Sequence, residues 1–448
     1  MSYIPHTEIE RQQMLASIGV TTIEDLFEAI PASHRFPKLD LPGPLSEMEV
    51  VAEMQALAEA NEHAEDFAVF RGAGAYHHFI PSVVNHMLLR GEFYTAYTPY
   101  QPEMSQGTLQ AVFEYQSMMC ALTGMDAANA SHYDGATSLA EAVTVAVEVA
   151  RHKRKNIILS NAIHPQYREV VRTYHQSGAV TITGDDEPAD IPALIDMIDK
   201  DTAMVAISYP NYFGQVESPA DVRQLADACH DNGALLVMVV NPLMLGLFKS
   251  PGELGADIVV GEGQPLGVPL SFGGPYLGFF AVRDKYVRKI AGRIIGETVD
   301  MDGKRAYVMT LRPREQDIRR EKATSNICTN QGLMALAAAV YMSLMGKNGL
   351  KQVTELNYHK AHYAAMQIDG IDGFKVNRNK AFWNEFTVKC PVPVDQINAA
   401  LIEEGIVGGV DLTEDYPTLP DHMLLCVTET NSKDEIDALV NVLKSVTQ

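Results

Sequence analysis

The polar residues that could do chemistry begin with a Gly-rich turn at residues 261–265. It follows the apolar run Ile258–Val260, which has the composition of a buried strand. In many enzymes of similar layout, a turn at this place carries a lysine that holds a cofactor. Here Gln264 and Pro265 stand in the turn, and it contains no lysine. The turn therefore raises the question of what such a fold does without that anchor.

A second candidate is the loop at residues 94–107, which reads YTAYTPYQPEMSQG. Its two prolines reduce the entropy cost of holding the loop in one shape. Its tyrosines combine an apolar ring with a polar tip, which suits a binding surface. The loop predicts either a binding site or interface, or a rigid surface loop packed by its own tyrosines. The candidate residues are Tyr97, Thr98, Tyr100, Gln101 and Glu103.

A third candidate is the start of a long helix in the segment NASHYDGATSLAEA, residues 129–142. A helix N-terminus offers free N–H groups and a positive dipole end, which suit a phosphate. Asp134 stands at this entry, and its carboxylate can satisfy the same N–H groups and repel an anion. We therefore predict a helix start capped by its own chain rather than a phosphate seat.

The segment LRPREQDIRREKATSN, residues 311–326, concentrates cations in an otherwise acidic chain. It could form an anion or carboxylate site. The spacing of Glu315 and Arg319 equally fits a salt-bridged helix surface. Both interpretations stay open for the cationic residues Arg312, Arg314, Arg319, Arg320 and Lys322.

The sequence offers little support for a metal site or a dinucleotide-binding site. His77 and His78 are adjacent and point apart, and the five cysteines are widely spaced without a C-x-x-C pair. The segment FRGAGAYHH, residues 70–78, lacks the strand–turn–helix context of a dinucleotide fingerprint. No metal site is predicted.

The net charge and the apolar runs indicate which binding partners and which cellular location to expect. A formal net charge of −22 argues against nucleic-acid and membrane-surface partners. The longest apolar run, residues 235–248, is broken by Asn241, Pro242 and Gly246, whereas a membrane span needs about 20 apolar residues. The start of the chain lacks the basic and apolar regions of a signal peptide. We expect a cytoplasmic protein.

Three segments are expected to position these residues. Residues 1–65 predict an N-terminal helical arm, with a capping box of Thr7 and Glu10. Residues 66–330 alternate apolar strands with helices, which predicts a large α/β domain with a mostly parallel sheet. The strand at 276–282 follows its predecessor by a loop too short for a helix, so that pair is expected to be antiparallel. Residues 331–448 predict a small C-terminal α+β domain.

Long stretches of the chain resemble one family, the glycine decarboxylase P-protein of the glycine cleavage system. They read GAGAYHHFIPSVV, EFYTAYTPYQPEMSQGTLQAVFEYQ, LTGMDAANASHYDGATSLAEA, GRIIGETVD and REQDIRREKATSNICTNQGL, between residue 72 and about residue 333. The length resembles the bacterial split form, in which two chains share the work of one double-length chain. The chain resembles the N-terminal, or alpha, subunit of that form.

The resemblance implies a pyridoxal-phosphate-dependent transferase fold of type I, like that of aspartate aminotransferase. It also implies glycine as the substrate of the complex and a lipoylated H-protein as acceptor of the aminomethyl group. That chemistry needs a Schiff-base lysine, an acid facing the pyridine nitrogen and a phosphate cradle. Here Gln264-Pro265 replaces the family's His-Lys, Val240-Asn241-Pro242 stands where the acid should end its strand, and Asp134 occupies the helix start.

These departures imply that pyridoxal phosphate sits in a homologous, lysine-bearing P-protein subunit 2, the beta chain. Because fold type I enzymes build their sites at a dimer interface, this chain can still line its partner's pocket. The 97–103 residues are the first candidates for that role. Behind them we place His77, His78, His132 and Tyr133. Two alternatives remain: a chain that binds the cofactor alone through Lys249 or Lys322, and a scaffold with no residue in the chemistry.

Overall fold

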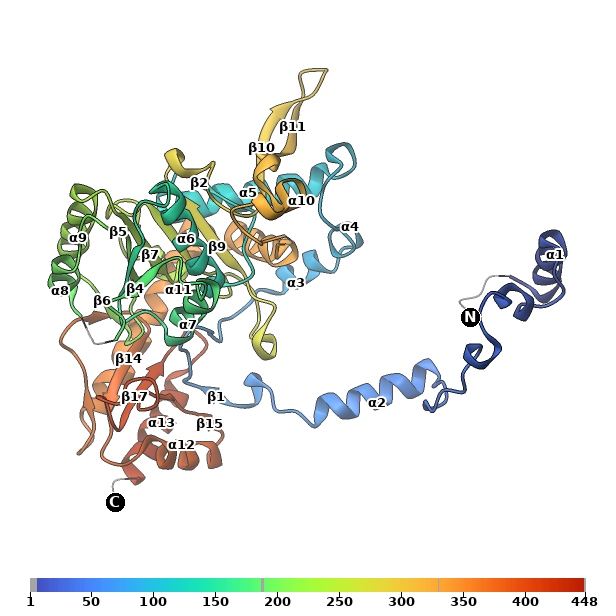
Figure 1. Ribbon diagram of the computed structural model, residues 1–448. Helices are drawn as coiled ribbons and strands as arrows, with labels where there is room; N and C mark the ends of the chain where they lie inside the picture. Colours follow the sequence, from blue (N-terminus) through green and yellow to red (C-terminus); the bar gives the residue numbers. More distant parts are fainter. Residues whose placement is uncertain (1–5, 187–188, 329, 447–448) are drawn as a thin grey trace. The chain divides into compact units, whose positions relative to one another are not determined.

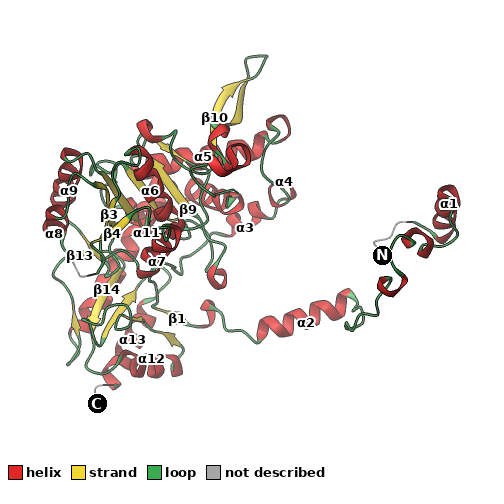
Figure 2. Cartoon of the chain, in the orientation of Figure 1, coloured by secondary structure: helices red, strands yellow, loops and turns green. Residues whose placement is uncertain are grey.

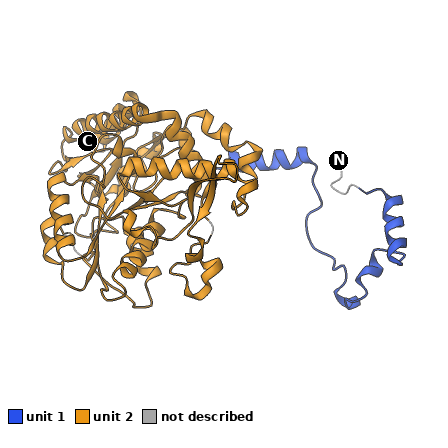
Figure 3. Cartoon of the chain, turned by 90° about the horizontal axis from the view of Figure 1, so that it is seen from above, with its two compact units in different colours: residues 1–62 blue, residues 63–448 orange. Residues whose placement is uncertain are grey.

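The computed structural model describes residues 6–186, 189–328 and 330–446 (Figure 1). Helices and strands alternate through most of this length (Figure 2). The chain divides into two compact units, residues 1–62 and residues 63–448 (Figure 3). All residues proposed for the site belong to the second unit.

The first unit consists of short helices. Helix α1, Glu8–Ile18, begins at the predicted capping box of Thr7 and Glu10 and ends at Gly19 with a φ of 90°. Residues 23–30 do not form an α-helix, and only a 3₁₀ turn forms there, η1 at Glu24–Phe27. The Asp25 carboxylate accepts hydrogen bonds from the N–H groups of Thr21 and Thr22, and these local bonds close a turn instead. A second 3₁₀ turn, η2 at Ala32–His34, and helix α2, Glu47–Glu59, complete the unit, and none of the α2 residues is buried.

A seven-stranded mixed sheet forms the centre of the second unit, in the order β2-β9-β8-β7-β5-β3-β4. Its strands are β2 (Ala127–Ala128), β3 (Asn156–Leu159), β4 (Thr181–Thr183), β5 (Thr202–Tyr209), β7 (Leu235–Val240), β8 (Ile258–Glu262) and β9 (Gly278–Val282). The five neighbouring strands β8, β7, β5, β3 and β4 are parallel to one another. Strand β9 runs antiparallel to β8, as its short connection predicted.

Successive strand residues face opposite sides of this sheet and join two different cores. Ile157, Met204 and Val237 pack with helices α6 (Gly135–Val149) and α7 (Pro165–Tyr174). Their neighbours in the strands pack on the other face, against helices α5 (Gln106–Thr123), α8 (Ile191–Asp196), α9 (Pro219–Asp231) and α11 (Gly332–Asp369). Helices on both faces explain why the strands read as near-continuous apolar runs. The expected doubly wound α/β fold is confirmed.

Helix α11 is the one helix among the described residues that is long and apolar enough to cross a membrane, judged by length and composition alone. Its backbone leaves the helical conformation at Gly346, which separates two straighter parts. The first part buries Ala335, Ala338 and Tyr341 against the central sheet. The second part buries Ala361 and other residues in the C-terminal core.

The C-terminal residues form an antiparallel sheet in the order β12-β14-β17-β16. The strands are β12 (Lys375–Val376), β14 (Glu385–Lys389), β16 (Val410–Asp411) and β17 (His422–Cys426). Helices α12, Val394–Glu403, and α13, Lys433–Ser445, cover it, and α13 begins at a capping box of Ser432 and Glu435. These elements share one hydrophobic core. The domain boundaries proposed at residues 65 and 330 stay predictions.

The remaining elements of the second unit are short. Strands β10 (Ile294–Val299) and β11 (Arg305–Thr310) form an antiparallel hairpin that projects from the body of the unit (Figure 1). Two further pairs are parallel β1 (Ala68–Val69) with β15 (Ile406–Val407), and antiparallel β6 (Gln215–Val216) with β13 (Ala381–Phe382). Short helices follow at α3 (Ser82–Leu88), α4 (Gly91–Tyr94) and α10 (Gln316–Arg319). The 3₁₀ turns are η3 (Ala64–Asp66), η4 (Pro102–Met104), η5 (Pro242–Gly246), η6 (Ser271–Gly273), η7 (Asp284–Tyr286), η8 (Arg312–Arg314) and η9 (Arg320–Lys322).

Candidate functional site

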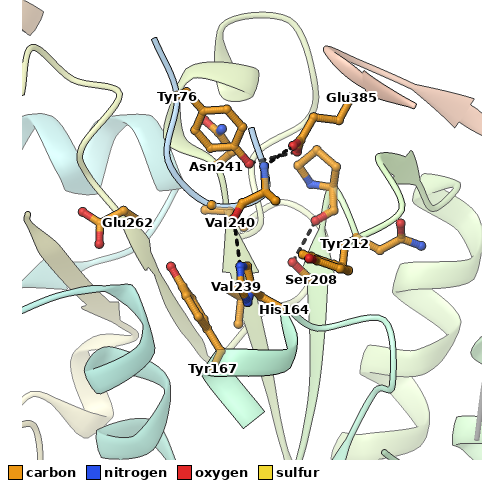
Figure 4. Close-up of a pocket in the computed structure, with 14 residues that line it drawn as sticks. Tyr76, His164, Tyr167, Ser208, Tyr212, Val239, Val240, Asn241, Glu262 and Glu385 are labelled. Carbon is orange, nitrogen blue, oxygen red and sulfur yellow. Dashed lines mark hydrogen bonds between the residues drawn. The ribbon is translucent and has the colours of Figure 1, made fainter. Parts of the chain in front are cut away.

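A pocket lies at the carboxyl ends of the parallel strands, where α/β folds bind their ligands (Figure 4). Strand β5 contributes Ser208, strand β7 contributes Val239 and Val240, and β8 contributes Glu262. The other lining residues come from the loop after β1, from the 164–167 segment, from the turns after β5 and β7, and from β14. They are Ala73, Gly74, Tyr76, His164, Tyr167, Pro210, Asn211, Tyr212, Asn241 and Glu385.

The start of helix α6 closes one side of this region with two carboxylates. Asp134 is the N-cap residue, and its Oδ1 accepts the N–H of Thr137 at 2.7 Å. Oε2 of Glu262 accepts the N–H of Gly135 at 3.0 Å. The predicted self-capping by Asp134 is confirmed, and Glu262 adds a second internal anion that the sequence did not reveal. A phosphate placed here would have to displace both carboxylates.

Backbone N–H groups outside helix α6 also bind the Glu262 carboxyl group. Its other oxygen, Oε1, accepts the N–H groups of Gln264 at 3.0 Å and Leu277 at 2.8 Å. Burial raises the pKa of Glu262 to about 7, although its three backbone N–H donors favour the ionised form. The packing is tight as well, because a Cβ on Gly135 would lie 2.4 Å from the Tyr167 hydroxyl oxygen. The space beside the helix start is filled.

Gln264 and Pro265 lie buried in the turn after β8. The Gln264 amide nitrogen donates to the carbonyls of Tyr76 at 2.9 Å and Val268 at 2.7 Å. Its amide oxygen accepts the N–H of Tyr76 at 2.9 Å. The side chain at this place thus ties the loop after β1 to the turn and has no free group for covalent chemistry.

The end of strand β7 carries an amide in place of an acid. Oδ1 of Asn241 accepts the N–H of Leu243 at 3.1 Å and caps the 3₁₀ turn η5. An amide there cannot supply the negative charge that keeps a pyridine nitrogen protonated. The three departures noted in the sequence therefore each have a local structural use.

Glu385 on strand β14 is a second buried carboxyl at the pocket. Its Oε1 accepts the N–H of Ala73 at 2.6 Å, and its Oε2 accepts the Tyr76 hydroxyl at 2.9 Å. Burial raises the pKa of Glu385 to about 7. Sequence reasoning missed this residue, although a glutamate in the apolar run WNEFTV was a signal.

The cavity that remains between these side chains is small. Its volume is about 70 Å³. Pockets for small-molecule ligands usually exceed roughly 300 Å³. The residues at the carboxyl ends of the strands therefore do not fit pyridoxal phosphate: the helix start is capped, the lysine position holds proline, and little volume is left.

The tyrosine loop lies elsewhere in the second unit, beside helix α5 and the start of strand β10. Tyr97 is 76% exposed, and Thr98 is half-buried. Tyr100 lies between two guanidinium groups, with its ring centre 5.7 Å from Arg293 and 5.3 Å from Arg312. Gln101 and Glu103 are exposed around the 3₁₀ turn η4. The loop therefore presents side chains to the outside and is braced from behind by arginines.

The histidine and tyrosine residues expected behind the loop occupy different places. Nδ1 of His78 lies 2.8 Å from Glu429 Oε2, and the His77 carbonyl accepts the hydroxyl of Thr428. His132 is fully buried against Phe280, and burial lowers its pKa to about 3. Tyr133 accepts the N–H of Cys328 at its hydroxyl oxygen. No hydrogen bond, ion pair or ring contact joins these residues to the side chains of residues 97–103 in the described part of the chain.

The basic segment after β11 does not form the Glu315–Arg319 side-chain pair, which was one of the two interpretations left open. Helix α10 is only four residues long, and Glu315 Oε2 lies 4.0 Å from Arg293 Nε. Arg314 donates to the carbonyls of Ile290 and Gly292, and Arg312 pairs with Asp317 at 3.4 Å. These arginines stabilise the approach to β10, next to the tyrosine loop. Sequence reasoning missed Arg293, which belongs to GRIIGETVD and not to the basic run.

Comparison with known proteins places the chain within one family. The family model described as the glycine cleavage system P-protein matches residues 1–443. A relative from Thermomicrobium roseum, named probable glycine dehydrogenase (decarboxylating) subunit 1, is 51% identical over 100% of both chains. A protein of the same name from Geobacillus kaustophilus is 50% identical over 98% of both chains.

Solved structures agree with the sequence comparison. A crystal structure of glycine decarboxylase (P-protein) of the glycine cleavage system, in inhibitor-bound form, superposes with a TM-score of 0.89. It is 40% identical, and the match covers 100% of both chains. A sphingosine-1-phosphate lyase from Burkholderia pseudomallei has a TM-score of 0.67 at 15% identity over 93% of this chain and 94% of that one, which shows the fold alone. The chain belongs to the glycine cleavage system P-protein family.

Proposed function

We propose that this chain is subunit 1 of a two-chain glycine dehydrogenase (decarboxylating), and that it completes an active site whose cofactor is held by its partner. The observation that carries this proposal is the internal capping of helix α6 by Asp134 and Glu262. The buried Gln264 and Pro265 in the turn after β8 support the same conclusion. The partner is a homologous chain that carries the Schiff-base lysine.

In this proposal glycine loses carbon dioxide in the partner's site, and its aminomethyl group passes to the lipoyl disulfide of the H-protein, which is thereby reduced. Pyridoxal phosphate supplies an electron sink for the decarboxylation when bound there. This chain contributes binding, orientation and exclusion of water, through the loop that carries Tyr97, Thr98, Tyr100, Gln101 and Glu103. The other candidates, His77, His78, His132 and Tyr133, lie at different places in the fold and are not assigned to that surface.

The exposed apolar side chains favour a large protein interface. From residue 79, just before α3, to residue 104, at the end of η4, five large apolar or aromatic side chains are each between 61% and 79% exposed. They are Phe79, Leu89, Tyr94, Tyr97 and Met104. Monomeric proteins seldom expose such a concentration of apolar surface. We infer that the partner chain covers this segment, and we place the assembled enzyme in the cytoplasm.

The test is co-expression with a lysine-bearing homologous chain. The purified single chain should show no glycine decarboxylation or bicarbonate exchange, and the complex with its partner and lipoylated H-protein should show both. Robust activity from the single chain would overturn the proposal. The alternative of a pure scaffold is separated by substitutions in the 97–103 loop, which would leave the rate of the complex unchanged if this chain contributed only structure.

A further inference from the structure

A second cavity, of about 230 Å³, lies beside the tyrosine loop and is built differently from the pocket at the strand ends. Tyr97 and Thr98 form one wall, and the first residues of helix α11 form another. Arg293, at the start of the β10 hairpin, lines it as well. None of the described residues that line this cavity carries a carboxylate.

Arg293 is a buried cation with spare hydrogen-bonding capacity. It is 4% exposed, and its two terminal nitrogens donate to Asn330 Oδ1 and to the Tyr100 hydroxyl, both at 3.3 Å. Its Nε has no hydrogen-bond partner among the described residues, and the nearest carboxylate oxygen, on Glu315, lies 4.0 Å away. Both terminal bonds are long and go to neutral groups. A buried guanidinium with only long hydrogen bonds to neutral groups is stabilised by an anionic partner.

Helix α11 points its N-terminus at the same cavity. Gly332 and Leu333, the first residues of the helix, both line it. The N-cap residue Gln331 makes no side-chain capping bond within the described part of the chain, and the first turn contains no acidic residue. The amide N–H groups of this turn and the positive end of the helix therefore add to the charge of Arg293.

The surrounding charges leave the region positive. Arg312 and Arg314 flank Glu315, and Arg312 is itself paired with Asp317. Burial raises the pKa of Glu315, while the neighbouring charges of Arg293 and Arg314 lower it. The cavity thus combines a buried cation, an open helix N-terminus and the hydroxyl of Thr98 without an opposing carboxylate in its wall.

We propose that this cavity binds an oxyanion, either the carboxylate of a small organic acid or a phosphate group. Arg293 supplies the charge, the first turn of α11 supplies backbone donors, and Thr98 supplies a hydroxyl. The start of α6 is capped by carboxylates of the chain itself. The start of α11 has no such cap among the residues that the structure describes, so its N–H groups can bind an external anion. The inference goes beyond the proposed function, since it concerns binding by this chain itself.

Position 332 allows a sharp test. A Cβ on Gly332 would meet no atom within 4 Å, so a side chain can be added there without steric conflict. Gly332→Asp places a carboxylate beside the first-turn N–H groups, where an acidic residue favours the helix. It should therefore keep the fold while repelling an external anion. Gly332→Ala is the matched neutral control.

The measurement is the thermal unfolding midpoint of the full-length chain against increasing inorganic phosphate or sodium acetate, with chloride added to hold the ionic strength constant. We expect a saturable rise in wild type and in Gly332→Ala, and an apparent Kd at least about ten-fold weaker in Gly332→Asp. Arg293→Gln should lose the response as well. Saturation by phosphate alone assigns a phosphate ligand, and saturation by acetate assigns a carboxylate.

The proposal is overturned if neither anion gives a saturable rise in wild type, or if Gly332→Asp responds as Gly332→Ala does. A non-saturating rise shared by all variants is general salt stabilisation and also overturns it. Because the readout is binding to the isolated chain, its failure is distinct from a failure of the partner-subunit proposal, which is read from the activity of the complex.

Discussion

The carboxylate of Glu262, at the end of strand β8, accepts a hydrogen bond at 3.0 Å from the N–H of Gly135, the first residue of helix α6. The two residues are 127 positions apart in the chain. With Asp134 on the same helix start, Glu262 gives this end of α6 two carboxyl groups of its own. In our proposal these two groups take the place that a cofactor phosphate would need at this helix start.

The packing around Gly135 predicts a stability cost. In Gly135→Ala the new methyl group would lie 2.4 Å from the Tyr167 hydroxyl oxygen and 2.9 Å from the Glu262 backbone nitrogen. We expect a loss of about 1–3 kcal/mol in the free energy of unfolding, because backbone must shift. Urea unfolding of the isolated chain measures it. Gly107→Ala, at an open position of helix α5, is the control and should be neutral or stabilising.

Restoring lysine alone should not restore cofactor binding. Pro265→Lys adds an amine, but Asn241 still offers no carboxylate for a pyridine nitrogen, and Glu262 still occupies the helix start. Borohydride reduction of the variant with pyridoxal phosphate, followed by peptide mapping, should find no stoichiometric label at residue 265. Tight binding and full labelling there would show that only the lysine was missing.

Glu385 predicts a pH dependence of stability. Its pKa is raised to about 7 in the folded chain, whereas an unfolded glutamate titrates near pH ~4.3. Between these values the folded state holds a proton that the unfolded state has released, so stability falls as pH rises. The effect of this group is at most about 4 kcal/mol.

Glu385→Gln keeps the shape of the side chain and removes the titration. Urea unfolding at pH 5.5 and pH 8 should show a smaller loss of stability in the variant than in wild type. Comparing the two chains cancels the other titrating groups. An equal loss in both would mean that Glu385 does not ionise in this range.

The sequence predicted the fold well because its signals are local. Continuous apolar runs mark strands covered on both faces, and Thr7 with Glu10 marks a helix start, since each pattern is set by neighbours in the chain. The capping by Asp134 was predictable for the same reason.

The positions of Glu262 and Glu385 at the first pocket, and of Arg293 at the second cavity, could not be predicted from such local patterns. Glu262 and Glu385 find their partners through tertiary contacts, and nothing near them in the chain names Gly135 or Tyr76. Arg293 stands outside the basic run that drew attention, yet it is the arginine that lines the second cavity beneath the tyrosine loop. Spacing alone also suggested a Glu315–Arg319 side-chain pair, but the Glu315 carboxylate lies near Arg293 instead.

The exposed ring of Tyr97 predicts a kinetic effect in the assembled enzyme. Tyr97→Ala should lower the rate of the complex about ten-fold or more without preventing assembly, because it removes a positioned contact beside the partner's site. Tyr97→Phe keeps the ring and tests the hydroxyl separately. Size-exclusion chromatography checks assembly, and wild-type kinetics for Tyr97→Ala in an intact complex would make the loop purely structural.

We propose that pyridoxal phosphate is held by the partner and not by this chain. The most direct measurement is borohydride reduction of the active two-chain complex with pyridoxal phosphate, followed by mass spectrometry of peptides from both chains. Our account predicts a reduced cofactor on one lysine of the partner and none on this chain. Stoichiometric label on a lysine of this chain, such as Lys249 or Lys322, would contradict it.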